Sequence, residues 1–540
     1  MSPLAAANFW LPTVDALSRF GPLWVLAGTV CAVLVGALIY GRRAQPTAAV
    51  ALIGAALTAM SCVSVRARAV AGGWAGLAPD GRAPMLLVDG FSIFFTLLVS
   101  LFLVAVIGLW WFGYRGGQSG MDMHASAPEF FVLLLASAVG MVLMVSTTNL
   151  LLLILAVEMA SLPSYALAGF EKRSRLGAEA SVKYVLFGGI TSAIMVYGVS
   201  LLYGQFQTLD LAVIAHQLAD GTRGGTLAAI ALFGLMVGIG FKISAVPFHF
   251  WCPDVFQGAA IEVTTWLSVA SKAAGLGLLL RVMGVAAAAG IEGGFASGLS
   301  IGVGIFAAIT CTVGNFCALH QTNIKRLLAY SSIAHAGYML MAGAILAGVS
   351  PDMAHPAFTA LTIYLIVYLF MNLGAFGVAA MVYWSSGEES LSGYTALGRR
   401  QPFLAVVMTV CLVSLVGLPP FGGFTAKYWL LINVWGAGLI WLVVVAVLNT
   451  ALSLYFYMRV IRQMWLIEGE GPAIRAPLAA QALVGICAAV ILWTGTLAID
   501  PIRRRAEGYA RSLFLGQPVA AEAQATPPAD AEPGRLASKP

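Results

Sequence analysis

Charged residues are scarce in this chain. Only 10% of its 540 residues are Asp, Glu, Lys or Arg, whereas 60% are hydrophobic. A soluble globular domain has about 25% charged residues, so this composition excludes a soluble globule. The net charge of +6 is too small and too dispersed to indicate a nucleic-acid-binding protein. The composition therefore predicts an all-α, polytopic membrane protein.

Paired metal-binding residues are also missing. The seven cysteines are scattered through apolar runs without a CxxC pair, which excludes the usual spacings of iron–sulfur and structural zinc sites. The glycine-containing segments at 238 and 275 lack the strand, turn and acidic residue of a dinucleotide site. We interpret Gly234 and Gly238 as a GxxxG helix contact. The chain is expected to carry no cofactor, no metal and no redox centre of its own.

Long apolar runs, by contrast, are abundant. A transmembrane helix needs about 20 predominantly apolar residues, and fourteen such runs can be counted. They lie at about 23–40, 47–65, 89–112, 129–147, 149–169, 181–203, 226–247, 262–283, 297–319, 324–348, 357–383, 402–434, 438–462 and 478–498. The first run lacks a basic n-region and a cleavage site, so we interpret it as a retained span.

The basic residues predict the orientation of these spans. Thirteen lie in loops after odd-numbered spans: Arg42, Arg43, Arg115, Lys172, Arg173, Arg175, Lys325, Arg326, Arg399, Arg400, Arg459, Arg462 and Arg475. Five lie in loops after even-numbered spans: Arg66, Arg68, Arg82, Arg223 and Arg281. Since basic loops stay in the cytoplasm, both termini are predicted to be periplasmic. Only the cluster Arg503, Arg504, Arg505 after the last span argues for the opposite orientation.

Lysine is rare, and its positions are unusual. Of only seven lysines, four lie inside predicted spans: Lys183, Lys242, Lys272 and Lys427. Each opposes insertion by roughly 2.5 to 3.5 kcal/mol, so the set opposes it by something like 10 kcal/mol. Glu158 adds an acidic group in the fifth span, where Pro163 predicts local irregularity. Because intramembrane charges usually mark a functional site, these five charged residues are our candidates for a proton pathway.

A purely structural role remains open for any single lysine. An isolated ammonium can extend to the membrane surface or form a structural ion pair, and Lys183 lies close to the start of its span. That explanation fails for the set, because Lys242 and Lys272 lie well inside consecutive spans. A buried lysine exchanges its proton near neutral pH, and a neighbouring carboxylate restores the ammonium. One such ion pair can therefore load or release a proton.

Other polar residues are weaker candidates. His335 could carry a proton at neutral pH, but a lone histidine in an apolar helix is more often a hydrogen-bonded core residue. Asp254 and Glu262 flank the segment PDVFQGAAIE and are interpreted as caps of the eighth span, since acidic residues favour helix amino ends. The residues expected to serve helix contacts are Tyr330, Ser331 and Ser332.

Two predicted spans contain breaks. Pro247 follows Lys242 in the seventh span, and Pro419 and Pro420 precede Lys427 in the twelfth. Non-helical backbone at membrane depth survives only where protein or water satisfies it, so such breaks mark an internal polar site. Their recurrence five spans apart predicts two inverted five-helix repeats. The predicted parts are an N-terminal three-helix segment, two repeats, a last helix with its flanks and a disordered tail, at 1–128, 129–283, 297–462, 463–512 and 513–540.

Several long motifs resemble a known family. They are EMASLPSYALAGF, EASVKYVLFGGITSAIMVYGVSLLYG, GFKISAVPFHFWCPDVFQGA, HQTNIKRLLAYSSIAHAGY and GLPPFGGFTAKYW. They are similar to the antiporter-like membrane subunits of respiratory complex I, the bacterial NADH:quinone oxidoreductase, over about residues 85 to 465. The segment NIKRLLAYSSIAH is shared with Mrp-type sodium/proton antiporters. PDVFQGA resembles the N-type branch, the counterpart of mitochondrial NADH dehydrogenase subunit 2.

The resemblance implies a role for each candidate. Glu158 and Lys242 would form the charged pair of one half-channel, Lys272 the central relay and Lys427 the residue of the second half-channel. Lys183 matches a further lysine of the N-type branch. The resemblance also implies that FMN, iron–sulfur clusters and quinone belong to partner subunits. The membrane partners would be the other antiporter-like and small spanning subunits, in the bacterial cell inner membrane.

We therefore expect a proton-translocating subunit of an NADH:quinone oxidoreductase, and two alternatives remain open. An Mrp-type sodium/proton antiporter subunit would use the same lysines without a redox partner. A structural membrane anchor for a dehydrogenase or hydrogenase-like module would tolerate replacement of the lysines by methionine without loss of pumping.

Overall fold

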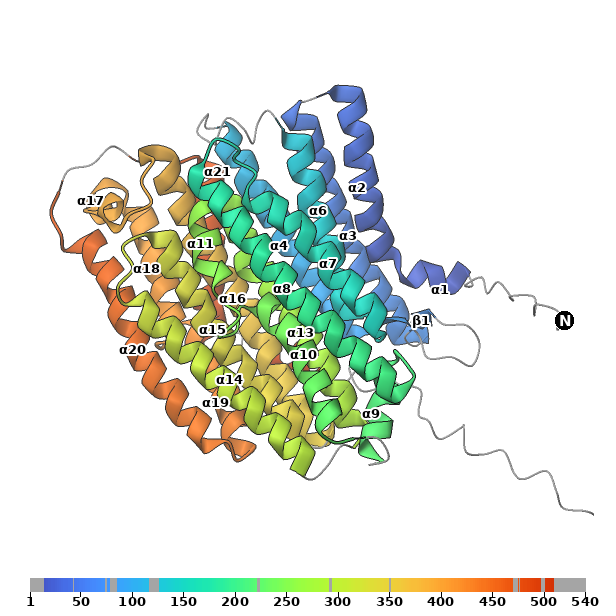
Figure 1. The fold of residues 1–540 in the computed structure, drawn as a ribbon. Coiled ribbons are helices and arrows are strands. Elements are labelled where there is room, and N and C mark those ends of the chain that lie inside the picture. The colour runs from blue at the N-terminus through green and yellow to red at the C-terminus, as the bar shows by residue number, and fades with distance from the viewer. Residues whose placement is uncertain are drawn as a thin grey trace, which may run out of the picture.

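The computed structural model describes residues 14–41, 43–72, 75–77, 85–115, 126–220, 224–290, 294–348, 351–469, 474, 476–496 and 501–508. Most of them belong to helices that run side by side in one bundle (Figure 1). The predicted all-α membrane class is confirmed, with one small addition. Strands β1 (Ala75–Leu77) and β2 (Leu86–Val88) form an antiparallel pair in which Ala75 lies opposite Val88. The predicted tail at 513–540 lies outside the described residues.

The amino-terminal helices form one flank of the bundle, where α2 and α3 appear in blue (Figure 1). These helices are α1 (Val14–Arg19), α2 (Gly21–Tyr40), α3 (Ala44–Gly72) and α4 (Gly90–Arg115). Pro22 occupies the first turn of α2, a position where the missing proline N–H costs no helical hydrogen bond. Only 22% of the residues in the apolar stretch of α2 are buried, so this helix lies at the edge of the bundle.

The middle of the chain contains the first predicted repeat. Its elements are α6 (Ala127–Ser146), α7 (Leu150–Ala168), α8 (Arg175–Phe206), α9 (Leu211–Ala219), α10 (Thr226–Ile243), α11 (Trp251–Gly258), α12 (Ile261–Trp266), the π-helix η1 (Leu267–Ser271) and α13 (Lys272–Ala288). Side-chain caps begin three of these helices. Asn149 and Asp210 each accept hydrogen bonds from two backbone N–H groups at the starts of α7 and α9, and Ser174 accepts one from the Gly177 N–H at the start of α8.

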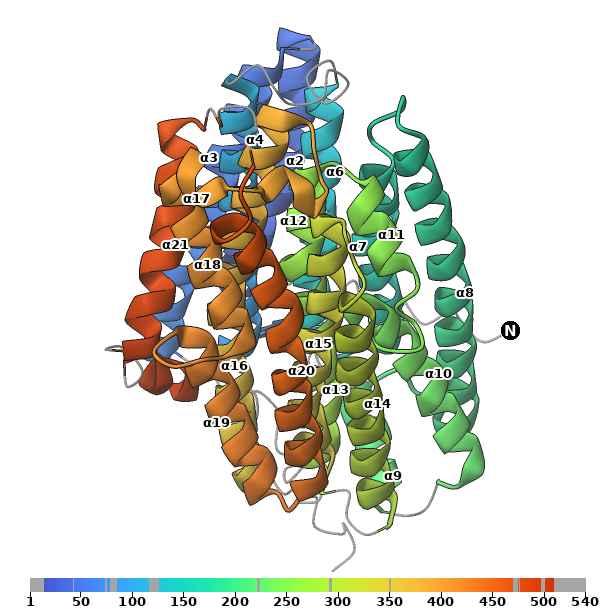
Figure 2. The ribbon, with the colours of Figure 1, turned by 90° about the vertical axis from the view of Figure 1, so that its left-hand side faces the viewer.

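The second predicted repeat and the last helix follow. Their elements are α14 (Gly294–Ala318), α15 (Ile324–Gly348), α16 (Pro351–Ser386), the 3-10 helix η2 (Leu391–Tyr394), α17 (Leu397–Arg400), α18 (Pro402–Val416), α19 (Gly422–Gly436), α20 (Ile440–Trp465) and α21 (Leu478–Thr496). In the view turned by 90°, α8 and α10 line one side of the molecule, and α21 lies on the opposite side (Figure 2).

Thirteen helices in the described part of the chain are long and apolar enough to cross a membrane. The twelfth predicted span, at 402–434, is instead divided into α18 and α19 of 15 residues each. The predicted count of fourteen therefore requires these two helices to cross the membrane together. The inverted relation between the two repeats and the domain boundaries stay predictions.

Three helical segments form the centre of the bundle. The span that joins α12, η1 and α13 is 94% buried, as is α15, and α16 is nearly as enclosed. Around them, α8 and α10 pack closely, because a Cβ atom at Gly234 would lie 2.9 Å from the Gly198 Cα. Gly234 thus serves helix packing, as its GxxxG spacing predicts. These central segments carry several buried polar side chains, among them Lys272, His335 and Asn372.

Both predicted helix breaks are present. Helix α10 ends at Ile243, where Ser244 adopts a φ of +64°, and α11 begins at Trp251. Helix α18 ends at Val416, where Gly417 adopts a φ of +87°. The irregularity predicted at Pro163 is wrong, because α7 continues through this proline to Ala168. Neighbouring hydroxyls supply local contacts there, and Ser164 Oγ donates to the Ala160 carbonyl at 2.7 Å.

Candidate functional site

Glu158 lies on α7 and faces α8. Its Oε1 accepts a hydrogen bond from the Ser192 hydroxyl. No ion pair joins Glu158 to a lysine in the part of the chain that the structure describes. Its charge nevertheless acts electrostatically on Lys242. The predicted partners Glu158 and Lys242 therefore interact through their charges without a hydrogen bond. The residue that contacts the Glu158 carboxylate directly is Ser192.

Lys242 occupies the last turn of α10, immediately before the helix break, and only 2% of it is exposed. The end of α10 packs against the π-helix η1, because Ser271 Oγ donates to the Lys242 carbonyl at 3.3 Å. A Cβ atom at Gly275 would lie 3.1 Å from the Lys242 Cβ, so a larger residue at 275 would collide with this lysine. The fold thus brings Lys242 to the helix that begins with Lys272.

Lys272 follows directly after η1 and is completely buried. Its Nζ lies 3.8 Å from the Cys252 Sγ and 4.9 Å from the centre of the Phe256 ring. π-helical turns often occur at functional sites, because the inserted residue changes the direction of the following side chains. The apolar pattern of the eighth predicted span contains no signal for this π-helix, so sequence reasoning missed it.

A chain of buried polar side chains continues from Lys272 into α15 and α16. The Cys252 Sγ lies 4.0 Å from the Ser332 hydroxyl, and Ser332 interacts with the Tyr368 hydroxyl. The Tyr368 ring packs against the His335 ring, with centroids 5.3 Å apart. These contacts make Ser332 more than the helix contact that the sequence suggested. Cys252, one of the scattered cysteines, is a member of the same chain.

His335 lies near the centre of this chain. Its Nδ1 is 2.8 Å from the Tyr364 hydroxyl, and its ring lies edge-on to Tyr338. Sequence reasoning retained His335 as a weak candidate and missed both tyrosines. The polar residues Ser331, His335 and Tyr338 recur at helical spacing in α15, and this recurrence was the available signal.

Lys427 lies on α19 beside the second helix break, and only 6% of it is exposed. Its Nζ donates a hydrogen bond to the Val416 carbonyl, the last residue of α18, at 2.9 Å. The same ammonium lies 4.5 Å from the centre of the Tyr338 ring. The break thus provides an exposed carbonyl as the acceptor for this lysine, in agreement with the expectation that interrupted helices create internal polar sites. We call the set Lys272, Cys252, Ser332, Tyr368, Tyr364, His335, Tyr338 and Lys427 the central polar chain.

Lys183 lies apart from this chain. It is partly exposed, and its Nζ is 2.6 Å from both Glu179 and Asp254. Asp254 also binds Arg326 at 2.5 Å, so its carboxylate joins α8 to α15. The interpretation of Asp254 as a simple helix cap is therefore wrong. Burial raises the pKa of Asp254, but the hydrogen bonds from Lys183 and Arg326 outweigh burial and hold this pKa below its ordinary value.

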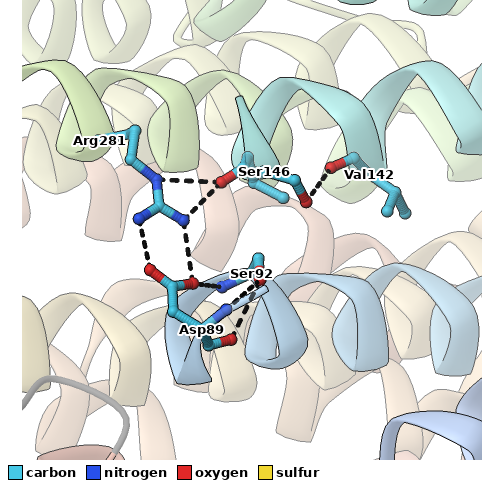
Figure 3. Close-up of polar contacts among 6 residues, drawn as sticks. Asp89, Ser92, Val142, Ser146 and Arg281 are labelled. Carbon is cyan, nitrogen blue, oxygen red and sulfur yellow. Dashed lines mark hydrogen bonds and ion pairs between the residues drawn. The ribbon is translucent and has the colours of Figure 1, made fainter. Parts of the chain in front are cut away.

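For Arg281, the predicted position in a loop is wrong. This residue lies inside α13, and 2% of its side chain is exposed. Figure 3 shows its guanidinium between the Asp89 carboxylate and the end of α6. Nη1 donates to Asp89 Oδ2 at 2.5 Å and Nη2 to Oδ1 at 3.0 Å, while Nη2 also donates to the Val145 carbonyl at 2.8 Å. A guanidinium is tolerated at this depth because each of these acceptors compensates for lost water.

Metal ligands do not gather in the described ranges. No group of three His, Cys, Asp or Glu side chains there is placed to hold a metal ion. The chemistry available to the central polar chain is that of amines, hydroxyls, a thiol and an imidazole. Groups of these kinds can accept and donate protons.

The sequence of the chain is similar to those of known membrane proteins. Residues 147–453 match the sequence model of the family described as "NADH:quinone oxidoreductase/Mrp antiporter, TM". NADH-quinone oxidoreductase subunit N of Anaeromyxobacter sp. (strain Fw109-5) is 39% identical over 521 residues, which cover 90% of this chain and 96% of the relative. Subunit N 2 of Sorangium cellulosum is 38% identical over 477 residues, which cover 85% of this chain and 90% of the relative.

The chain is also similar to chains of solved structures. A chain of respiratory complex I from Thermus thermophilus with bound aureothin is 32% identical, with a TM-score of 0.73, and the match covers 89% of this chain and 98% of that chain. A chain of the Mrp complex from Dietzia sp. DQ12-45-1b is 20% identical, with a TM-score of 0.77, over 92% of this chain and 98% of that chain. The second match concerns the fold alone.

Proposed function

The chain belongs to the membrane-subunit family of NADH:quinone oxidoreductases and Mrp antiporters, among relatives of the N type, and we propose that it translocates protons within an NADH:quinone oxidoreductase. The observation that carries this proposal is the central polar chain. It extends from Lys272 on α13 to Lys427 on α19 through the most buried helices of the bundle.

In this proposal protons move between neutral and charged side chains. Lys272 and Lys427 hold protons at the two ends of the central polar chain. Between them, the hydroxyls of Ser332, Tyr368 and Tyr364 and the His335 imidazole accept a proton on one side and release another on the other. Such groups can transfer protons because each offers both a donor and an acceptor. Three links of the chain have polar atoms 2.8 to 4.0 Å apart. The links from His335 to Tyr368 and from Tyr338 to Lys427 are ring contacts, so in this proposal side-chain movements or intervening water complete the path there.

Glu158 and Lys242 control access to Lys272 from the first predicted repeat. While Glu158 is charged and close, it stabilises the ammonium of Lys242. When the carboxylate turns toward Ser192 or moves away, that stabilisation falls and the proton can pass on. A shift equivalent to two pKa units is roughly 2.7 kcal/mol, whereas 100 mV of membrane potential opposes one charge by about 2.3 kcal/mol. One such switch is therefore large enough to move a proton against the potential.

The energy for the cycle comes from partner subunits. FMN, iron–sulfur clusters and quinone are assigned to those subunits in this proposal, and the chain contributes no redox step. The other antiporter-like and small spanning subunits are its membrane neighbours, in a bacterial inner membrane. The Mrp-type alternative has weaker support. The family model includes both groups, but the solved Mrp chain is only 20% identical, whereas the N-type relatives are 38 to 39% identical.

The proposal is tested by Lys272→Met in the intact complex, reconstituted in liposomes, with NADH oxidation and proton uptake measured together. Lys172→Met makes the same chemical change at an exposed position between α7 and α8 and is the matched control. We expect Lys272→Met to lower coupled NADH oxidation and pumping at least about tenfold and the control to leave both unchanged. Normal pumping by an assembled Lys272→Met complex would contradict the proposal and favour the structural anchor.

A further inference from the structure

Glu262 has a different environment from that of a helix cap. It lies in the first turn of α12, but only 2% of it is exposed. Its Oε1 has no hydrogen-bond partner in the described part of the chain. A buried carboxylate oxygen without a donor is strongly disfavoured as an anion and is well suited to hold a proton.

The surroundings of Glu262 contain one cation and several acids. Lys325, on α15, places its Nζ 2.9 Å from the Ala259 carbonyl, three residues before Glu262. The same ammonium pairs with Glu389 at 2.6 Å. The groups that act electrostatically on Glu262 from neighbouring elements are Glu171, Lys325 and Tyr383. Lys325 is thus already paired, and the cluster has more carboxylates than cations, a composition that favours binding of one proton.

Polar side chains line the continuous helical segment between Glu262 and Lys272. Thr265 and Ser268 follow Glu262 at spacings of three residues, so all three lie on one face of the helix. Both hydroxyls are buried, and they donate to the Ile261 and Thr265 carbonyls at 2.7 Å. Ser268 lies within η1, the π-helix that ends immediately before Lys272. Its carbonyl also accepts a hydrogen bond from the Tyr368 hydroxyl at 3.4 Å.

We propose that Glu262 is a proton-loading residue that takes up protons at the end of the bundle predicted to face the cytoplasm and supplies Lys272. This inference rests on the proposed function. A proton from water at the Lys325–Glu389 surface binds Oε1 of Glu262 and makes it a neutral acid. The Thr265 and Ser268 hydroxyls each accept one proton and release another, and the neutral amine of Lys272 receives the last. Glu262 returns to the carboxylate, so the proton count balances.

The test uses Glu262→Gln, which keeps the shape of the side chain but cannot carry the proton. Inverted membrane vesicles that contain the intact complex expose the predicted uptake side to the medium. We expect coupled NADH oxidation and pumping to fall severalfold and to decline more steeply as the external pH rises, because uptake becomes limiting when protons are scarce. A packing defect would lower activity equally at every pH. Glu468→Gln, at an exposed acid that pairs with the exposed Arg399, is the matched control and should leave the pH profile unchanged.

Two further variants keep the test decisive. Ser268→Ala removes one hydroxyl of the proposed path and should reproduce the steeper pH profile, even where Glu262→Gln prevents assembly. Lys272→Met serves as the reference. Wild-type pH profiles of Glu262→Gln and Ser268→Ala beside an inactive Lys272→Met would overturn this inference and leave the proposed function intact. A fully active Lys272→Met would overturn the proposed function itself.

Discussion

Arg281 and Asp89 are 192 positions apart in the chain, yet they form a bidentate ion pair in which almost no part of either side chain is exposed. The pair joins α13 to the start of α4, and the Val145 carbonyl connects it to the end of α6 (Figure 3). Ser92 supports it, because the Ser92 N–H donates to Asp89 Oδ1 at 2.7 Å. Three helices from two predicted parts of the chain are therefore held at one point.

We predict that loss of one partner of this pair destabilises the subunit. Arg281→Met leaves the Asp89 carboxylate buried without its counter-ion, and such changes cost about 3 to 5 kcal/mol. The amount of intact complex in the membrane and its thermal denaturation midpoint should both fall. The double variant Arg281→Met/Asp89→Leu should recover part of the loss, since it removes both charges. Equal losses in the single and double variants would contradict this account.

Glu158 and Lys242 should act as one electrostatic unit. Glu158→Gln and Lys242→Met should each lower proton pumping at least about tenfold. The double variant should show less than the sum of the two effects, because residues in one network share their interaction energy. Lys242→Arg should not restore pumping fully, since a guanidinium stays protonated and cannot release a proton. Pumping and NADH oxidation are measured on equal amounts of assembled complex, and strictly additive effects would refute the coupling.

Ser192 provides a second test of the same unit. Because its hydroxyl donates to Glu158, Ser192→Ala should leave the carboxylate more available to Lys242 and shift the pH dependence of pumping. The expected change in rate is smaller than that of Glu158→Gln, since the charge remains. Thr191→Val changes a neighbouring hydroxyl that donates only to backbone carbonyls of α8, so it is the control. Identical pH profiles for the Ser192 variant and the wild type would show that the hydrogen bond from Ser192 to Glu158 does not affect pumping.

Gly417 should be required for the position of Lys427. A Cβ atom at residue 417 would lie 2.8 Å from the Lys427 Cδ, and the backbone there has a φ of +87°. A non-glycine residue in this region costs roughly 1 to 2 kcal/mol, so Gly417→Val should displace the ammonium from the Val416 carbonyl and reduce pumping. Gly436→Ala is the control, because it changes a glycine at the end of α19, the helix that carries Lys427, where a Cβ atom meets nothing within 4 Å. Pumping by the two variants is compared at equal assembly, and unimpaired Gly417→Val would contradict the prediction.

The orientation of the bundle is open to direct measurement. In a cysteine-free background, Arg173→Cys and Arg400→Cys should react with a membrane-impermeant thiol reagent from the cytoplasmic side. Gly436→Cys, at the exposed end of α19, should react from the periplasmic side, as should a cysteine after Arg511, which lies outside the described residues. This pattern follows from the excess of basic residues in loops after odd-numbered spans. Reaction of Arg173→Cys from the periplasm would reverse the predicted topology.

The local features of this protein could be predicted from the sequence. Apolar runs of sufficient length predict helices wherever they occur, because the free energy of membrane insertion is close to a sum over residues. Lys242, Lys272 and Lys427 are conspicuous for the same reason, and prolines predict the breaks after Ile243 and Val416. Even here one rule failed, since Pro163 did not interrupt α7.

Contacts between helices were decided only by the tertiary structure. Hydropathy places a residue in a span but does not say toward which neighbour it turns, because that depends on helix rotation and packing. Arg281 could therefore be taken for a loop charge, and Asp254 and Glu262 for helix caps. The π-helix η1 lies in one of the most enclosed spans of the described bundle, and hydropathy gives no signal for it. The sequence by itself determined which polar groups the membrane would have to accommodate, and the tertiary structure determined which of them lie close enough to exchange a proton.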